Sequence, residues 1–252
     1  MSTSAAILPA NEMSPVLATI SAATAIGIGF TYATVFPGSQ LWGKVLMRGP
    51  NTSRAVALTF DDGPTPGATD AILDVLESHN ARATFFVIGA NAERHPDLLR
   101  RIHSRGHLLA NHTYHHAHHG WLGTPRYWRD EIQRTDDIIH QAIGLRPAIF
   151  RPPMGIKTYF TLNEARRLGH TTVAWSRRAM DGISTTPERI LLRLAELTPG
   201  DIVLLHDGIQ PHRTRDPRAT AEALPRLIDS IRGQNLEPKR LDELLGISGY
   251  HH

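Results

Sequence analysis

The run Ala55-Val-Ala-Leu-Thr-Phe-Asp-Asp-Gly-Pro64 decides the fold of this chain and indicates its chemistry. Its apolar residues predict a buried strand, which Gly63-Pro64 ends abruptly. Asp61 and Asp62 stand at the strand end, where two ionised carboxylates repel each other unless a positive charge lies beside them. A metal ion meets this need, because one carboxylate can bind it while the other acts as a base. A helix-capping turn is the alternative, but it explains a pair of aspartates poorly.

Outward from this run, short apolar segments alternate with helix-like ones. The predicted strands cover residues 55–61, 84–88, 107–110, 149–151, 171–175 and 202–205. The predicted helices cover residues 68–79, 92–104, 127–143, 161–168, 187–197 and 220–232. Repeated strand–helix pairs predict an α/β fold with a parallel sheet buried on both faces, either open or closed into a barrel. The polar residues of chemical interest follow the strands, where α/β barrels carry their active sites.

Length and composition limit the alternatives. The chain has 252 residues, a formal net charge of +3 and no cysteine, so disulfides, thiolate metal sites and thiol nucleophiles are excluded. We expect an N-terminal segment over residues 1–44 and one catalytic domain over residues 45–250. The sequence pI near 9.5 comes from scattered arginines. No basic run is interleaved with aromatic residues, so no nucleic-acid partner is expected.

The N-terminal segment is uncharged from Met13 to Gly43. Residues 16–36 are long enough to cross a bilayer and predict a single-pass helix in the bacterial inner membrane. A helix docked on the following domain, or a disordered tail, is the alternative. Lys44, Arg48 and Arg54 follow the segment, and this charge bias places the catalytic domain in the cytoplasm.

A histidine cluster follows the third predicted strand. His112 and His116 are four residues apart, and on a helical turn residues at this spacing share a face, so both rings can reach one ion. Together with Asp62 they form three protein ligands and leave a position for water, as a catalytic metal needs. A histidine-rich surface loop without a metal is the alternative.

Two further strand ends carry candidate catalytic groups. In Arg151-Pro-Pro-Met-Gly155 the arginine can pair with a carboxylate and lower its pKa, and a loop N–H can donate to a developing oxyanion. His206 follows an apolar strand and is a candidate general acid. Asp181 is a candidate to fix the tautomer of His206 and to keep it protonated.

Taken together, these motifs resemble the polysaccharide deacetylases of carbohydrate esterase family 4, the family of the nodulation chitooligosaccharide deacetylases. The resemblance covers roughly residues 50 to 245. Its motifs follow the family's order: Thr-Phe-Asp-Asp-Gly-Pro, Ala-Thr-Phe-Phe-Val-Ile-Gly, Asn-His-Thr-Tyr-His-His, Arg-Pro-Pro-Met-Gly and Leu-Leu-His. It implies a distorted (β/α) barrel with about seven parallel strands, preceded here by an apolar helix.

The resemblance also implies a role for each candidate residue. Two side chains transfer protons and two orient them: Asp61 as base, His206 as acid, Arg151 to orient Asp61 and Asp181 to orient His206. The remaining residues bind the metal or the acyl group: Asp62, His112 and His116 as ligands of a divalent ion, usually Zn²⁺, the Met154 N–H in the oxyanion site and Leu204 in the acetyl pocket.

The implied activity is removal of N-acetyl groups from N-acetylglucosamine-type sugars of the cell envelope. Peptidoglycan, a chitin-like oligosaccharide and a lipid-linked sugar are the candidate substrates. Two alternatives are hydrolysis of another C–N amide, such as a formamide or cyclic ureide, and a catalytically dead, membrane-tethered glycan-binding protein.

Three positions depart from the family's pattern. Gly182 stands where tryptophan is common, Arg178 replaces an aspartate, and Met154 replaces an aromatic residue. Loss of the indole is expected to open one wall of the acyl pocket. These changes bear on the acyl group or the sugar that the site accepts.

Overall fold

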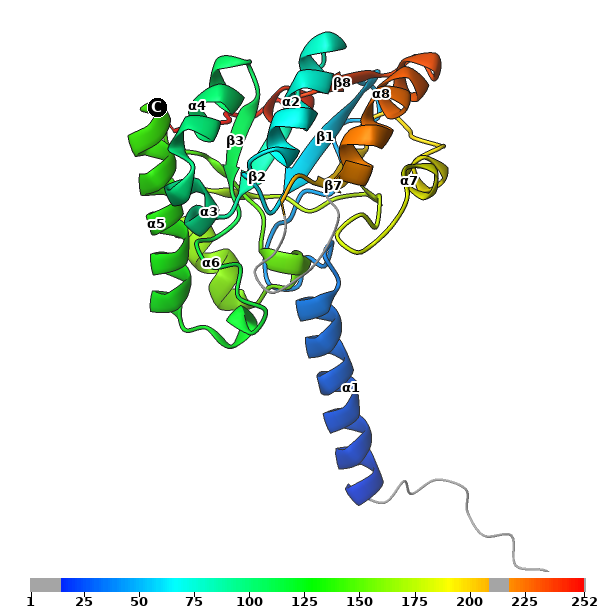
Figure 1. Ribbon diagram of the computed structural model, residues 1–252. Helices are drawn as coiled ribbons and strands as arrows, with labels where there is room; N and C mark the ends of the chain where they lie inside the picture. Colours follow the sequence, from blue (N-terminus) through cyan, green and yellow to red (C-terminus); the bar gives the residue numbers. More distant parts are fainter. Residues whose placement is uncertain (1–14, 209–217, 252) are drawn as a thin grey trace, which may run out of the picture.

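The chain forms one open, curled sheet surrounded by helices, in a computed structural model that describes residues 15–208 and 218–251 (Figure 1). The strands run in the order β5-β4-β3-β2-β1-β7-β6, with β8 paired beside the first residues of β1. Every strand pairing is parallel. The strands are β1 (Ala55–Asp61), β2 (Thr84–Val87), β3 (Leu108–Asn111), β4 (Ile149–Phe150), β5 (Thr171–Thr172), β6 (Arg177–Arg178), β7 (Ile202–His206) and β8 (Glu237–Lys239).

The first helix precedes the sheet, and the others follow strands in sequence. The helices are α1 (Pro15–Val35), α2 (Ala68–Ser78), α3 (Gly89–Arg94), α4 (Pro96–Ser104), α5 (Pro125–Ile143), α6 (Tyr159–Arg167), α7 (Pro187–Arg193), α8 (Arg218–Gly233) and α9 (Leu241–Leu245), with short 3₁₀ turns η1 (Gly120–Leu122) and η2 (Pro153–Gly155). Local signals set several boundaries. Thr124 caps α5 and proline follows it at the first helical position, while Gly144 ends that helix in the left-handed conformation.

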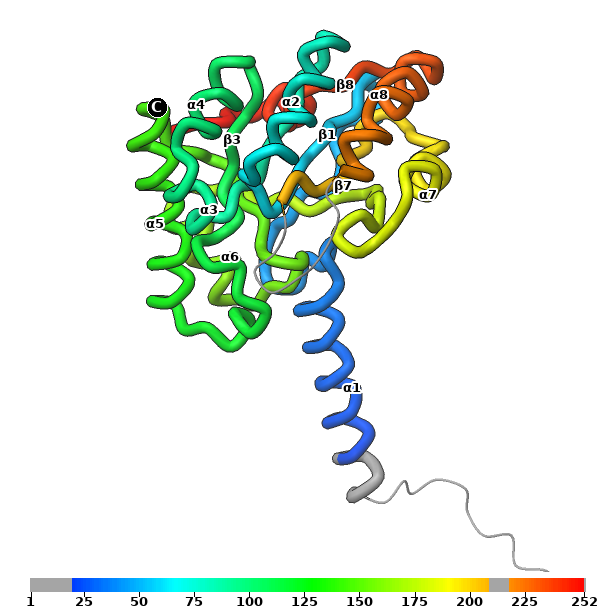
Figure 2. Tube along the Cα trace, in the orientation of Figure 1, coloured from blue at the N-terminus to red at the C-terminus, as the bar shows by residue number. Residues whose placement is uncertain are grey.

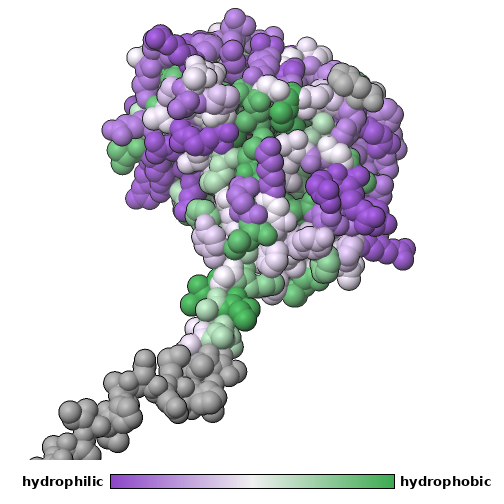
Figure 3. Space-filling view, turned by 180° about the vertical axis from the view of Figure 1, so that it is seen from behind, coloured by the Kyte–Doolittle hydropathy of each residue, from purple (hydrophilic) through white to green (hydrophobic). Residues whose placement is uncertain are grey.

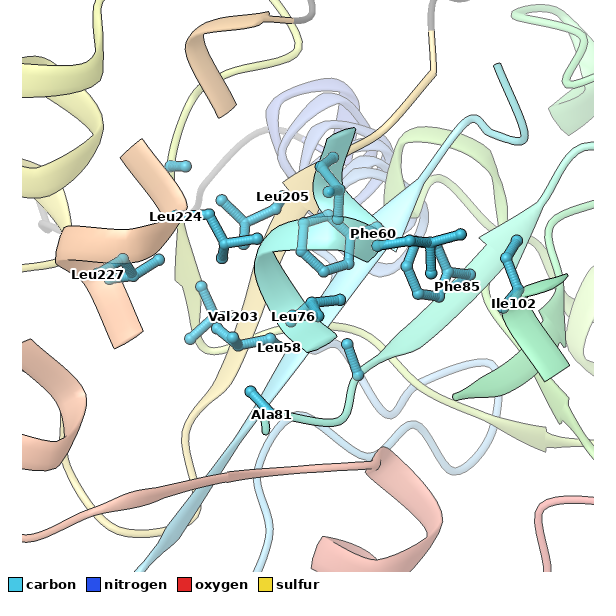
Figure 4. Close-up of a cluster of buried hydrophobic side chains, with 14 of the residues drawn as sticks. Leu58, Phe60, Leu76, Ala81, Phe85, Ile102, Val203, Leu205, Leu224 and Leu227 are labelled. Atoms are coloured by element: carbon cyan, nitrogen blue, oxygen red, sulfur yellow. The ribbon is translucent and has the colours of Figure 1, made fainter. Parts of the chain in front are cut away.

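The two faces of β1 have different neighbours, because successive side chains of a strand point to opposite sides. Val56, Leu58 and Phe60 pack in the larger core. Figure 4 shows Leu58 and Phe60 among side chains of the neighbouring strands and of the helices that cover this face. Ala55 and Ala57 pack in a second core on the inner face, with Leu241 and Leu244 of α9. The inner face therefore carries small residues low in the strand and Asp61 at its end.

The predicted α/β fold and its parallel strands are confirmed. The predicted helix over 92–104 is divided instead, because Pro96 begins α4 and His95 leaves the helical conformation before it. The strands β6 and β8 and the helix α9 were not predicted. They are two to five residues long, and β6 and β8 consist of charged residues and a proline, so neither has the apolar pattern of a buried strand.

The N-terminal helix exists, but the localisation predicted for it is wrong. The helix α1 covers Pro15–Val35 and projects from the body as a single rod (Figure 2). Across residues 15–208 and 218–251, no helix has both the length and the apolar character needed to cross a bilayer. Threonine, serine and glycine recur through this segment, so it lacks charge without being strongly apolar. The predicted inner-membrane anchor and membrane partner are therefore not supported.

The end of α1 is docked on the body. Lys157 is fully buried, its backbone N–H donates to Thr34 O at 3.0 Å, and its Nζ donates to Phe36 O at 2.7 Å. A lysine at the last carbonyls of a helix also complements the helix dipole. Seen from behind, hydrophobic side chains gather along the described part of α1 and where it meets the body (Figure 3). These contacts fix the end of α1 next to the segment that follows η2.

Candidate active site

The candidate residues meet at the carboxyl end of the sheet because the strand register brings them there. In the parallel pairing of β1 with β7, Asp61 lies opposite His206. The pairing of β3 with β4 places Asn111 opposite Phe150, so the residues that follow these two strands are also neighbours. Parallel strands that end together place their last side chains around one opening at the carboxyl end of the sheet, called the mouth below.

Asp61 is held by Arg151. The two side chains are buried, and Arg151 Nη1 donates to Asp61 Oδ1 at 2.6 Å and to Thr59 Oγ1 at 2.9 Å. Arg151 Nη2 donates to Ala174 O at 3.0 Å, and its guanidinium lies 3.9 Å from the centre of the Phe86 ring. Burial raises the pKa of Asp61 above its ordinary value, although the nearby charges of Arg151 and His206 oppose the shift.

Asp62, His112 and His116 form a buried group of ligand-type atoms, one from each residue, that lie within 4.8 Å of one another. The nearest His116 Nε2–Asp62 Oδ1 distance is 3.4 Å, and the corresponding distance from His112 Nε2 is 3.6 Å. Asp62 Oδ1 and His116 Nε2 are buried and have no hydrogen-bond partner among the described residues. Such unpaired buried atoms are costly unless another group binds them.

A single divalent ion fits these distances. Tetrahedral ligands about 2.1 Å from a metal lie about 3.4 Å apart, close to the 3.4 and 3.6 Å that separate Asp62 Oδ1 from the two histidine nitrogens. His112 Nδ1 lies 2.8 Å from Arg151 O, so this nitrogen donates its proton and Nε2 keeps its lone pair for a metal. Burial lowers the pKa of His112 to about 3 and also lowers that of His116, which favours the neutral rings that metals bind.

The histidine pair converges for a different reason from the one predicted. Residues 112–116 form a loop, and the predicted helical turn is wrong. Thr113 has φ 65° and His116 has φ 52°, and these two left-handed residues turn the chain so that the rings of His112 and His116 lie 4.8 Å apart. His115 points elsewhere and pairs with Glu131.

His206 is oriented by Asp181. Its Nδ1 lies 2.8 Å from Asp181 Oδ1, and its backbone N–H donates to Asp181 Oδ2 at 2.9 Å. Thr220 Oγ1 donates to the same Oδ2 at 2.8 Å. Burial lowers the pKa of His206, but the Asp181 carboxylate and the charges of Asp61 and Asp62 more than offset this and raise the pKa to about 9. The protonated ring can therefore present an Nε2 proton at neutral pH.

Met154 and Leu204 line one small pocket next to His206. Its volume is about 180 Å³, and it also contacts Trp175, Arg178, Met180, Gly182 and Ile183. Met154 has φ 56° in the η2 turn, and the neighbouring N–H groups of Gly155 and Ile156 donate to Pro152 O and Pro153 O at 3.0 Å. The turn thus holds an irregular backbone beside the pocket.

Several supporting residues were not predicted. Asn111 donates to Asp136 and accepts from the Thr113 N–H, which ties the histidine loop to α5. Asn91 Nδ2 donates to Asp62 O at 2.8 Å. Asp207 is fully buried and accepts a hydrogen bond from Thr69. Polar residues adjoining the motifs were the available signal, but their long-range partners are set only by the fold.

A buried Asp–His–His group that could hold a metal ion, a carboxylate paired with arginine and an Asp-supported histidine lie together at the carboxyl end of a curled parallel sheet. These features are typical of metal-dependent hydrolases. The sequence model described as "Polysaccharide deacetylase" matches residues 48–173. The chain belongs to this family, carbohydrate esterase family 4, and the resemblance drawn from its motifs is confirmed.

Named relatives support this membership. The chain is 37% identical over 200 residues to a chitooligosaccharide deacetylase of Bradyrhizobium sp., covering 76% of this chain and 91% of the relative. It is 35% identical over 180 residues to a peptidoglycan-N-acetylglucosamine deacetylase of Bacillus cereus, covering 71% of this chain and 65% of that relative's length. The chain thus spans somewhat less than two thirds of the second protein.

Solved structures share the fold. A crystal structure of a peptidoglycan N-acetylglucosamine deacetylase, in complex with a substituted benzamide, superposes with a TM-score of 0.76 at 30% identity and covers 82% of this chain and 95% of that chain. A family 4 pseudoenzyme mutant with restored enzymatic activity superposes with a TM-score of 0.72 at 26% identity, covering 80% and 71%. The same fold thus occurs both in a deacetylase and in a pseudoenzyme.

Proposed function

We propose that this protein is a metal-dependent N-deacetylase of N-acetylglucosamine-type sugars in a cell-envelope glycan, with residues 45–250 as its catalytic domain. The observation that carries the proposal is the convergence of the unpaired Asp62 and His116 atoms and His112 beside an aspartate that is paired with arginine. Relatives named as chitooligosaccharide and peptidoglycan deacetylases support the choice of an N-acetylated glycan.

Asp62, His112 and His116 would hold the cation. We propose zinc, because two imidazoles and one carboxylate at these spacings suit its tetrahedral coordination and leave one position open. When bound, the ion would supply positive charge that polarises the amide carbonyl and favours deprotonation of a water molecule. Since Asp62 is assigned to the ion, Asp61 remains available for proton transfer.

Asp61 acts as the general base and removes a proton from the attacking water. Arg151 fixes its Oδ1 at 2.6 Å, so the other oxygen, Oδ2, is directed towards the mouth, 3.6 Å from His112 Nε2. The pKa of Asp61 is raised by burial, which makes its carboxylate a stronger base than an exposed aspartate.

The opposite side of the site completes the reaction. The backbone N–H of Met154 donates to the oxygen that gains negative charge as the carbonyl becomes tetrahedral. His206 Nε2 then gives its proton to the departing nitrogen, while Asp181 holds the imidazole ring in place through Nδ1. Water is added across the C–N bond, so acetate and an amino sugar are the products. Leu204 contacts the acetyl group in the small pocket.

Metal removal and reloading test this function. The purified full chain is stripped with a chelator, reloaded with Zn²⁺ and given N-acetylglucosamine oligosaccharides, and acetate release is measured. We expect at least about a hundred-fold loss of release without metal and its recovery on reloading. Unchanged turnover after confirmed metal removal would contradict the proposal.

Two variants provide a matched control. His116→Ala removes a buried ligand, whereas His119→Ala removes an exposed histidine from the same loop. We expect only the first to lose bound metal and acetate release. Turnover of a formamide or cyclic ureide, but of no sugar, would identify a different amidase. Saturable glycan binding without turnover would identify a binding protein.

A further inference from the structure

Arg178 faces the pocket beside His206 because of the strand register. In the parallel pairing of β6 with β7, Arg178 lies opposite Leu204, and the Ala179 N–H donates to Leu204 O at 3.1 Å. Side chains at the same level of neighbouring strands share a face. Ala179 is buried in the main core, so Arg178 and Met180 on either side of it turn the opposite way. Arg178, Met180 and Leu204 line the pocket, whereas Ala179 does not.

The charge of Arg178 is not used within the fold. In the described parts of the chain, 15–208 and 218–251, the side chain of Arg178 has no ion pair, hydrogen bond or ring contact. Its neighbour Arg177 is on the other face and pairs with the buried Asp201 at 3.4 Å. Among the residues that line this pocket there is no carboxylate. Arg178 is therefore a positive charge in the wall of a pocket that, besides His206, is lined by apolar residues and glycine.

Gly182 leaves space in the same wall. A Cβ atom there would lie 3.1 Å from His206 Cε1 and 3.2 Å from His206 Nε2, so the absence of a side chain keeps the edge of the imidazole open. Two other residues of the pocket wall, Met180 and Ile183, are 37% and 50% exposed. A group larger than a methyl can therefore extend from the reacting amide towards Arg178.

We propose that Arg178 is a specificity-determining residue that binds a carboxylate carried by the N-acylated sugar substrate. Guanidinium groups bind carboxylates through two parallel hydrogen bonds, and this geometry rejects neutral analogues. The inference rests on the proposed deacylase function and adds no chemical step to it. Two substrates provide the required chemistry: a sugar with an ether-linked carboxylate beside its acetamido group, and a sugar whose acyl group itself ends in a carboxylate.

Three oligosaccharides distinguish these sources. One carries neutral N-acetylglucosamine, the second an N-acetylated sugar with an ether-linked carboxylate, and the third an N-succinyl group. Release of the free amine is measured for the zinc-loaded full chain. We expect kcat/KM for one of the two charged substrates to exceed that of the neutral one by about ten-fold or more. The preferred substrate identifies the position of the carboxylate.

Arg178→Gln should abolish this preference, so that kcat/KM for the preferred charged substrate falls to the value for the neutral one. Arg178→Lys should retain part of the preference, and higher ionic strength should reduce it because the pair is partly exposed to solvent. Arg126→Gln, which changes an arginine whose side chain is 89% exposed on α5, is the matched control and should leave all three rates unchanged.

The outcomes separate the two proposals. Turnover of the neutral substrate without any preference for charge, or equal losses on all substrates in Arg178→Gln, would overturn the role of Arg178 and leave the deacylase function intact. Absence of turnover on all three substrates by the metal-loaded wild type would overturn the proposed function, and with it the carboxylate substrate.

Discussion

Two sides of the same mouth are built differently. On the side formed by β1, β3 and β4, the five residues proposed for metal binding and base catalysis are each 3% exposed or less: Asp61, Asp62, His112, His116 and Arg151. On the side formed by β6 and the segment after it, Met180 and Ile183 are exposed and Arg178 has no partner among the described residues. The first side holds the proposed metal-binding and base residues in place, and the second side is open to a substrate.

This difference in burial predicts how each side tolerates amino-acid substitutions. A buried charge must be paired, so removal of one partner leaves the other in a low-dielectric environment at a high cost. An exposed, unpaired side chain adds little to stability and can change without cost to the fold. Substitutions should therefore destabilise the buried side, whereas substitutions on the open side should alter only rate or selectivity.

The largest expected effect on the fold comes from Arg151→Met. This change leaves Asp61 buried without its 2.6 Å partner and should lower the free energy of unfolding by about 3–5 kcal/mol. Chemical denaturation followed by circular dichroism measures the loss. The control is Arg134→Met, whose partner Glu93 has a 49% exposed side chain; we expect a change below about 1 kcal/mol. Equal losses of unfolding free energy in the two variants would show that the buried pair stabilises the fold no more than the exposed one.

Asp181→Asn should shift the pH dependence of turnover. His206 must be protonated to act as an acid, and its pKa of about 9 keeps it protonated through neutral pH. Activity should therefore fall as pH rises through about 9. Without the Asp181 charge, only Asp61 and Asp62 oppose the lowering of the pKa by burial, so the fall should move to lower pH. The pH profile of kcat/KM measures this.

Asp181→Asn distinguishes the effect of the Asp181 charge on the pKa of His206 from its role in orienting the ring. Asparagine keeps the side-chain shape of Asp181, so circular dichroism and metal content should remain unchanged. A loss of activity that is uniform across pH, with the alkaline limb still near 9, would show that Asp181 only positions the ring.

Gly182→Ala is expected to have the smallest effect, on the open side. The new Cβ would lie 3.1–3.2 Å from the His206 ring, which is tight enough to displace the imidazole by a few tenths of an ångström. We expect kcat to fall by roughly three- to ten-fold, with little change in stability. Gly233→Ala, where a Cβ would meet nothing within 4 Å, is the control. An unchanged kcat in Gly182→Ala would show that the His206 ring can accommodate the added methyl group without losing its catalytic position.

The two sides also differed in how well they could be predicted. The strand β1 and its terminal aspartates were predictable, because a long apolar run and Gly63-Pro64 are local signals. The convergence of His112 with His116 depends on left-handed backbone at Thr113 and His116, which is rare for such residues and is imposed by the surrounding structure.

The open side and the N-terminal helix were harder to predict because their features depend on distant contacts. The two-residue strand β6 has no apolar pattern, and the direction of Arg178 follows from its pairing with Leu204. For α1, the absence of charge was a local signal, but its end is held by Lys157, which comes 121 residues after its partner Phe36 in the sequence. Such partners are set only when the chain has folded.

The central claim is that the adjacent aspartates have different tasks, and it is tested by measuring zinc content and acetate release together in Asp61→Asn and Asp62→Asn. Asp61→Asn should retain about one zinc per chain and lose turnover by about a thousand-fold, since the base is removed while the ligands remain. Asp62→Asn should lose both zinc and turnover. Loss of zinc in Asp61→Asn with full occupancy in Asp62→Asn, or substantial turnover by Asp61→Asn, would contradict the account.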